Sequence, residues 1–165
     1  MINKIKIFND VEKILIKNKL TIFSKDLDRP WGGFYVINEE KSEKFFNIFF
    51  NNSFIKKVNF NNKLSHKILF IKPKKRLSWQ YHNRRSEIWT VIKGNIKICK
   101  SENNNEGKLI KLIKNDQIEI ANKIRHRIIG TDDYALVAEI WIHENNDNPS
   151  DENDIVRLQD DFDRK

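Results

Sequence analysis

From Ser65 onward the sequence consists of short runs in which apolar and polar residues alternate, and this alternation is its most constraining feature. Each run is rich in Ile, Val, Phe or Trp, and turn-forming residues separate the runs HKILFIK, LSWQYH, EIWTVIK, NIKICK, KLIKLI, QIEIA, HRIIG and YALVAEIWIH. A period of two is typical of strands with one buried face. Many short strands at this spacing predict an all-β sandwich or barrel.

The first part of the sequence follows a different pattern and predicts a short N-terminal α/β extension of the barrel. NDVEKILIKNK has apolar residues at helical spacing, and EKSEKFFNIFF repeats that pattern. Between them, RPWGGFYVI predicts a turn followed by a short strand. We therefore expect one structural domain, in which residues 1–64 decorate a barrel formed with its tail by residues 65–165.

Composition restricts the classes of partner. The chain has 165 residues, enough for one domain with a sizeable core, and a net charge of +8. The lysines are scattered rather than gathered into a stripe, so we expect no nucleic-acid partner and keep an anionic small molecule open. The single cysteine, Cys99, excludes an internal disulfide and is expected to be a small buried hydrophobe.

The sequence contains no recognisable secretion signal or membrane span. MINKIKIFNDVEK lacks a long apolar core and a small-residue cleavage site. No apolar stretch approaches the roughly 20 residues that a membrane-spanning helix needs. Together with the lack of a disulfide framework, these features predict a cytoplasmic protein without a membrane partner.

Polar residues interrupt the strand pattern in LSWQYHNRRSEIWTVIKG. Gln80 and His82 are two apart and share one strand face, and the short polar break that follows allows a hairpin to set Glu87 beside His82. His126 opens a later strand. Imidazole nitrogens with carboxylate and amide oxygens suit a divalent metal such as zinc, iron, manganese or nickel. Spacing alone keeps the alternative open that these histidines are ordinary core or surface residues.

This constellation resembles the cupin superfamily, in which a first motif carries His-x-His, Glu and Gly and a second motif carries one His. Gln80 stands at the first His, and the remaining places are filled by His82, Glu87, Gly94 and His126. That replacement makes the chain similar to the cupin domain of type II mannose-6-phosphate isomerases, in a stand-alone form. The segments that carry the resemblance are RPWG at 29–32, KPKKRLSWQYHNRRSEIWTVIKG at 72–94, RH at 125–126 and NDIVRLQDDFDR at 153–164.

The chain departs from the family pattern at two turns. Lys74 stands where the family has Gly. The Pro-x-Gly that usually precedes the second-motif His is replaced by residues 122–124, Asn-Lys-Ile. The resemblance still covers residues 28–164 and implies a cupin jelly-roll barrel.

The resemblance also implies a metal-dependent aldose–ketose isomerase that interconverts mannose 6-phosphate and fructose 6-phosphate. It implies one divalent metal, zinc in the first place and iron, manganese or nickel otherwise, held by Gln80, His82, Glu87 and His126. Such a metal polarises the substrate carbonyl and stabilises the enediolate. The reaction also needs a base that moves the proton and a cation that holds the phosphate.

The candidates for the base are Glu139, Lys67 and a hydroxide at the metal, and the candidate for the phosphate is Arg157. Each side chain has an ordinary alternative. Glu139 would instead lie on a wet outer face, and Lys67 would be a solvated ammonium group. For Arg157 the alternative is an ion pair with Asp160 or Asp161. Pattern alone does not choose between these readings.

Two further functions stay open: a non-catalytic metal- or sugar-binding cupin, and a different cupin enzyme such as a sugar epimerase or a dioxygenase. Gln80 argues against dioxygenases, in which histidine ligands dominate. Arg85 matches a family position, but its place in a hairpin favours a surface role. By analogy with cupins that pair through edge strands, we expect a homodimer.

Overall fold

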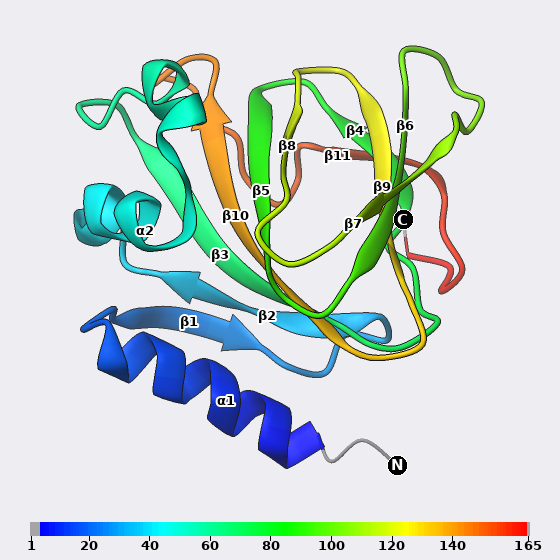
Figure 1. The fold of residues 1–165 in the computed structure, drawn as a ribbon. Coiled ribbons are helices and arrows are strands. Elements are labelled where there is room, and N and C mark those ends of the chain that lie inside the picture. Colours follow the sequence, from blue (N-terminus) through cyan, green and yellow to red (C-terminus); the bar gives the residue numbers. More distant parts are fainter. Residues whose placement is uncertain (1–3, 165) are drawn as a thin grey trace.

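Strands dominate the computed structural model, which describes residues 4–164 (Figure 1). The all-β cupin barrel with a short N-terminal α/β region is therefore confirmed. In chain order the elements are α1 (Lys4–Lys17), β1 (Ile22–Asp26), β2 (Gly32–Ile37), η1 (Glu39–Lys41), α2 (Ser42–Phe49), η2 (Asn52–Lys57), β3 (Leu64–Ile71), β4 (Trp79–His82), β5 (Arg85–Lys93), β6 (Ile96–Ser101), β7 (Leu109–Leu112), β8 (Gln117–Ile120), β9 (Arg125–Gly130), β10 (Ala135–His143) and β11 (Ile155–Gln159).

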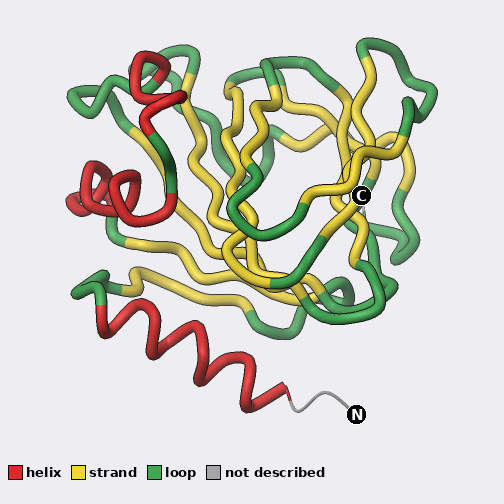
Figure 2. The backbone as a smooth tube through the Cα atoms, in the orientation of Figure 1, coloured by secondary structure: helices red, strands yellow, loops and turns green. Residues whose placement is uncertain are grey.

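The strands form two antiparallel sheets that face each other across the barrel interior (Figures 1 and 2). One sheet has the order β1-β2-β3-β10-β5-β8, and the other has the order β11-β4-β9-β6-β7. Consecutive strands are often not neighbours: β10 pairs with both β3 and β5, and the tail strand β11 pairs with β4. Residues far apart in the sequence therefore meet inside the barrel.

The predicted segments correspond to observed elements, with two differences at the N-terminal end. The first predicted helix is α1, which begins at Lys4 and so extends further toward the N-terminus than the predicted segment. The strand β1 was not predicted, because its side chains are largely exposed and its sequence IFSKD shows no apolar alternation. It pairs with β2 at the edge of the larger sheet, where one side of a strand has no neighbour.

The larger sheet buries both of its faces. Its outer face packs against α1 and α2, which lie outside the barrel (Figure 1), in an apolar core that includes Val11, Phe45, Phe46, Ile68 and Ile140. Its inner face meets the second sheet in another core that includes Leu69, Trp89, Ile98, Ile128 and Val137. The alternation along β3 and β10 assigns successive residues to these two cores.

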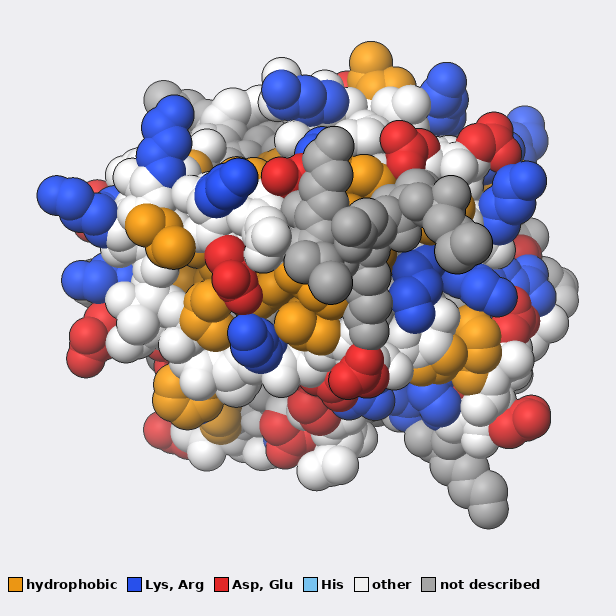
Figure 3. All heavy atoms as spheres, turned by 90° about the horizontal axis from the view of Figure 1, so that it is seen from below, with side chains coloured by type: hydrophobic (Ala, Val, Ile, Leu, Met, Phe, Trp, Pro, Cys, Tyr) orange, Lys and Arg blue, Asp and Glu red, His pale blue; other side chains and the backbone are white. Residues whose placement is uncertain are grey.

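Charged side chains of both signs are interspersed on the face seen from below (Figure 3), in agreement with the scattered lysines of the sequence. Within residues 4–164, no helix has the length and apolar character needed to cross a membrane.

Cys99 is a buried free cysteine, as predicted.

A histidine lies in the outer core of the larger sheet. The side chain of His66, on β3, is 0% exposed, and its ring centroid lies 5.2 Å from that of Phe45. Neither ring nitrogen has a hydrogen-bond partner in the part of the chain that the structure describes. Burial, with a smaller contribution from His143, lowers the pKa of His66 from 6.5 to about 4. The folded protein therefore keeps this histidine neutral at pH values where the unfolded chain protonates it.

We expect His66 to make the fold less stable in mild acid. The unfolded chain binds a proton at His66 near pH 6.5 and the folded chain only near pH 4, so stability falls as the pH falls through this window. When the pH is lowered from 7 to 5, the free energy of unfolding should decrease in both proteins. The decrease should be about 2 kcal/mol smaller in His66→Leu than in wild type.

Urea denaturation at the two pH values measures this difference. Ile140→Val is the matched control, because Ile140 is the cross-strand partner of His66, is 0% exposed and does not titrate. It should lower stability by about 0.5–1.5 kcal/mol at both pH values alike. Equal pH dependence in wild type and His66→Leu would contradict a neutral buried His66.

Candidate metal centre and active-site cavity

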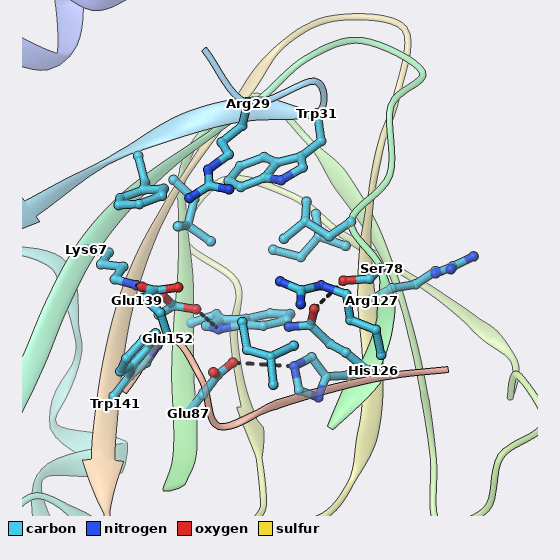
Figure 4. A pocket seen from close by; sticks show the side chains of 18 of the residues that line it. Arg29, Trp31, Lys67, Ser78, Glu87, His126, Arg127, Glu139, Trp141 and Glu152 are labelled. Carbon is cyan, nitrogen blue, oxygen red and sulfur yellow. Dashed lines mark hydrogen bonds and ion pairs between the residues drawn. The ribbon is translucent and has the colours of Figure 1, made fainter. Parts of the chain in front are cut away.

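A cavity of about 310 Å³ opens inside the barrel between the two sheets, and Figure 4 shows most of the side chains that line it. Its volume lies at the lower end of the range typical of small-molecule sites. Acidic and basic groups are gathered in it together with the indoles of Trp31, Trp89 and Trp141. The charged residues that line it are Glu87, Glu139, Glu152, Arg29, Lys67, Arg85, Arg127, Arg157 and Arg164.

Three side chains on three strands form a compact cluster, and two of them, Glu87 and His126, line this cavity. His82 ends β4, Glu87 lies on β5 and His126 lies on β9, and each is 2% exposed. His82 Nε2 lies 3.2 Å from Glu87 Oε1, and His126 Nε2 lies 3.5 Å from Glu87 Oε2. Bonds of about 2.0–2.1 Å to a tetrahedral metal place ligand atoms roughly 3.4 Å apart. The distances from each imidazole to Glu87 are close to this value, and one ligand atom from each of the three residues lies within 4.8 Å of the other two.

Both imidazoles are held with the same ring nitrogen toward Glu87. His82 Nδ1 lies 3.0 Å from the carbonyl oxygen of Asp154, and His126 Nδ1 lies 2.8 Å from that of Ile124. A carbonyl only accepts hydrogen bonds, so each Nδ1 carries the proton and each Nε2 carries a lone pair. His126 Nε2 makes no hydrogen bond to any residue of the described range 4–164. This donor set, two imidazole lone pairs and a carboxylate, fits a divalent metal.

The protonation states of the cluster suit metal binding. Burial lowers the pKa of His82 to about 3 and also lowers the pKa of His126, so both rings are neutral at pH 7. Burial alone would raise the pKa of Glu87, but its interactions with His82 and Arg85 hold that pKa well below its usual range, and with both imidazoles neutral at pH 7 the charged neighbour is Arg85. Arg85 Nε donates to Glu87 Oε1 at 2.7 Å, which keeps the carboxylate ionised.

Gln80, the fourth predicted ligand, lies beside the cluster but with its amide nitrogen toward it. Its Nε2 is 3.3 Å from His82 Nε2, and its Oε1 accepts a hydrogen bond from Ser78. An amide nitrogen has no lone pair to give a metal. Because the two ends of a carboxamide have nearly the same shape, rotation of the amide would turn the oxygen toward the cluster.

Arg85 is a site residue that the sequence analysis missed, and the predicted surface role is wrong. Its side chain is 2% exposed, and its guanidinium lies 3.5 Å from the ring centroid of Trp141. Besides Glu87, it contacts His82, with Nη2 lying 3.0 Å from Nε2 of that ring. The available signal was the spacing, because Arg85 and Glu87 are two apart on one strand and share a face.

Glu139 lies in the cavity, and the alternative of a wet outer face is excluded by its 5% exposure. On β10 it stands between Lys67 of β3 and Trp89 of β5. Trp89 Nε1 donates to Glu139 Oε1 at 3.1 Å. Burial in the first place, and the charge of Glu87 in the second, raise the pKa of Glu139 to about 8. Two carboxyl groups of one cavity therefore have pKa values shifted in opposite directions.

Lys67 also points into the cavity, and its side chain is 7% exposed, so the alternative of a solvated lysine does not hold. Its ammonium forms an ion pair with Glu152, from the loop between β10 and β11. It also lies 3.7 Å from the ring centroid of Trp141. The positive charge of Lys67 is thus fixed close to Glu139 on the neighbouring strand (Figure 4).

Arg157 forms part of the cavity wall on β11 and stands opposite Gln80 on β4. Burial and the nearby Arg164 lower its pKa. The charge of Asp160 acts on Arg157 in the opposite direction, and both acidic residues considered from the sequence also contact other arginines. Asp160 accepts a hydrogen bond from Arg164 Nε at 3.0 Å, and Asp161 accepts one from Arg76 Nε at 2.6 Å.

Comparison with known proteins agrees with this architecture. The family described as mannose-6-phosphate isomerase C-terminal matches residues 47–160. No curated protein matches the chain. The structure is similar to oxalate decarboxylase from Bacillus subtilis, with a TM-score of 0.58 and 12% identity over 84% of this chain and 31% of that one.

A second similar structure is vicilin from Corylus avellana (hazelnut), with a TM-score of 0.55 and 14% identity over 78% of this chain and 34% of that one. The chain thus spans about a third of the length of both proteins. At these identities the two structures establish the fold alone. The family match covers well over half of the sequence, and the chain therefore belongs to the family of mannose-6-phosphate isomerase C-terminal domains, with a cupin fold.

Proposed function

We propose that the protein is a metal-dependent aldose–ketose isomerase of a sugar phosphate, with mannose 6-phosphate and fructose 6-phosphate as its substrates. The observation that carries this proposal is the His82–Glu87–His126 cluster, of which Glu87 and His126 line the same cavity as the carboxyl group of Glu139. The family match supports the same reaction. An isomerase of this kind must stabilise an enediolate and move one proton between neighbouring carbons, and these two groups of residues suit the two tasks.

The proposed cofactor is one divalent metal, zinc first and iron, manganese or nickel as alternatives, held by His82, Glu87 and His126. Rotation of its amide would let Gln80 supply an oxygen as the fourth ligand, and His82 Nε2 would then bind the metal instead of contacting Arg85. When bound, such a metal polarises the substrate carbonyl and stabilises negative charge on the enediolate oxygens. Arg85 keeps its hydrogen bond to Glu87 and so maintains the charge balance around the buried carboxylate.

Glu139 is the proposed proton-transfer group. As a carboxylate it takes the proton from the carbon beside the carbonyl, and as a carboxylic acid it returns that proton to the former carbonyl carbon, while the hydroxyl proton of the substrate passes to the former carbonyl oxygen, so no net proton is consumed. Trp89 Nε1 fixes the orientation of its carboxyl group. Lys67 is less suited to act as the base, because its ammonium is held by Glu152 and by the face of Trp141. Its charge instead favours the ionised form of Glu139.

Arg157 is the proposed group that holds the phosphate. It lies on the cavity wall beside the charges of Arg29 and Arg164, which both contribute to its lowered pKa and also line the cavity. A guanidinium matches the oxygens of a phosphate with two parallel hydrogen bonds. The alternative function, a non-catalytic metal- or sugar-binding cupin or another cupin sugar isomerase or epimerase, would use the same cavity. The kinetic experiment below separates the non-catalytic function from the proposed isomerase.

Metal content tests the first element of the proposal. Purified protein that is stripped and reconstituted should bind about one zinc ion per chain. His82→Ala should weaken binding by more than about a hundred-fold, because even changes in residues behind metal ligands cost ten- to a hundred-fold. His66→Leu is the matched control, since it removes a buried histidine from the opposite face of the larger sheet. Wild-type protein without stoichiometric metal, measured by elemental analysis, would refute the proposed centre.

Steady-state kinetics on mannose 6-phosphate separates catalysis from binding. Glu139→Gln should lower kcat by about 10²–10⁴-fold, because the amide cannot accept the proton. Arg157→Ala should lower kcat/KM by about ten- to a hundred-fold, mostly through KM, because the phosphate contact exists before and during the reaction. Arg76→Ala should leave both constants nearly unchanged, since Arg76 pairs with Asp161 and does not line the cavity.

Two outcomes would change the proposal. Metal-loaded wild type that turns over no sugar phosphate would favour the binding function. An active enzyme with full activity in Arg157→Ala would keep the isomerase and discard the phosphate site.

A further inference from the structure

We propose that Asp154 is a positioning residue of the metal centre, which fixes two of its three side chains from the C-terminal segment. The inference rests on the proposed metal centre and goes beyond it, because Asp154 is not itself placed to bind a metal. Asp154 lies just before β11, in the segment that runs along the β4–β5 hairpin, and is 6% exposed. Two separate sets of hydrogen bonds lead from it to the cluster.

The first set fastens Asp154 to the end of β4. Its carbonyl oxygen accepts the hydrogen bond from His82 Nδ1 at 3.0 Å. Its carboxylate accepts the backbone N–H groups of Asn83 at 3.1 Å and Arg84 at 2.9 Å, the two residues of the hairpin turn that follow His82. One residue thus holds both the imidazole of His82 and the backbone of the turn that follows it.

The second set reaches Glu87 through two intermediate side chains. Ser150 Oγ donates to Asp154 Oδ2 at 2.7 Å and accepts from Arg85 Nη1 at 2.8 Å. Arg85 Nε then donates to Glu87 Oε1 at 2.7 Å. All four residues are buried, so each bond in this chain lies out of reach of bulk water and is hard to replace by solvent.

The chemistry of this position requires an ionised carboxylate. Asp154 receives two backbone N–H groups and one hydroxyl group, and its Oδ1 also lies 3.7 Å from Arg84 Nε. A carboxylate has acceptors for all of these donors, whereas the amide of asparagine would turn an N–H₂ group toward at least one of them. Asp154→Asn keeps the size and leaves the backbone carbonyl to His82, so it tests the carboxylate alone.

A displacement of the hairpin would affect metal affinity directly. Metal ligands have to be held within about 0.5 Å of their productive positions. Mutation of a residue that orients a metal ligand through a hydrogen bond typically lowers metal affinity by about ten- to a hundred-fold. Asp154 meets that description twice, since the turn after His82 and the orientation of Arg85 against Glu87 both depend on its carboxylate.

The test is the affinity of the metal-free protein for Zn²⁺, measured by competition with a chromophoric chelator, together with the visible absorption spectrum of the Co²⁺-loaded protein. Asp154→Asn should weaken Zn²⁺ binding by about ten- to a hundred-fold and change the Co²⁺ spectrum. Asp161→Asn is the matched control. It removes another tail carboxylate, paired with Arg76, and should leave affinity and spectrum as in wild type.

A purely structural role would lower the thermal stability of Asp154→Asn and leave the Zn²⁺ affinity of the folded fraction and the Co²⁺ spectrum unchanged, and this result would overturn the inference. Should Asp154→Asn fail to fold, Ser150→Ala provides the test, because it removes only the second set of hydrogen bonds between Asp154 and Glu87. It should weaken Zn²⁺ binding by about two- to ten-fold, and unchanged binding would overturn the inference. Wild-type protein that binds no metal would instead refute the proposed centre itself.

Discussion

A carboxylate that is almost completely removed from water has to be compensated by neighbouring charge and hydrogen bonds, and the architecture around Glu87 follows from this requirement. Removing one compensating partner from a buried ion pair typically costs about 3–5 kcal/mol. Glu87 contacts Arg85, His82 and His126, which come from three different strands. The barrel must therefore close with β4, β5 and β9 in a fixed relation before this carboxylate can be buried.

The same cavity holds a second carboxyl group, that of Glu139, whose pKa is shifted in the opposite direction. Arg85 lies in direct contact with Glu87, whereas Glu139 receives its hydrogen bond from the neutral indole of Trp89. Burial therefore prevails at Glu139 and raises its pKa to about 8, while charge compensation prevails at Glu87. Two carboxyls with separated pKa values suit separate tasks, a permanent anion that binds metal and a group that gains and loses a proton.

Much of this site could be predicted from local spacing, because a period of two fixes which side chains share a strand face. That rule correctly placed Gln80 and His82 on one face and Glu87 beside His82. The same rule would have placed Arg85, but the presumption of an exposed hairpin prevailed. Asp154 and Glu152 were not accessible to this reasoning, since their contacts join a loop after β10 to strands far earlier in the chain.

The turns show a different limit of sequence reasoning. Lys74, which replaces a glycine of the family pattern, has a φ of +57°, and Lys123, in the turn before His126, has a φ of +62°. Both lie in the left-handed region that favours glycine, at a cost of roughly 1–2 kcal/mol for another residue. The fold thus keeps these turn conformations despite unfavourable residues, because the strands on either side fix the backbone. The turn with Lys123 is tied to the first motif through its N–H, which donates to the carbonyl oxygen of His82 at 3.0 Å.

The N-terminal region explains how the barrel tolerates so many charges on its inner face. The strands β3 and β10 direct Lys67 and Glu139 inward, where they contribute little apolar burial. Their outward residues, such as Ile68 and Ile140, pack instead against α1, α2 and β2 in the outer core. Each buried aliphatic side chain of this kind contributes about 1.5–3 kcal/mol. The extension before the barrel therefore supplies hydrophobic stabilisation on one face of the larger sheet, and this leaves the other face available for chemistry.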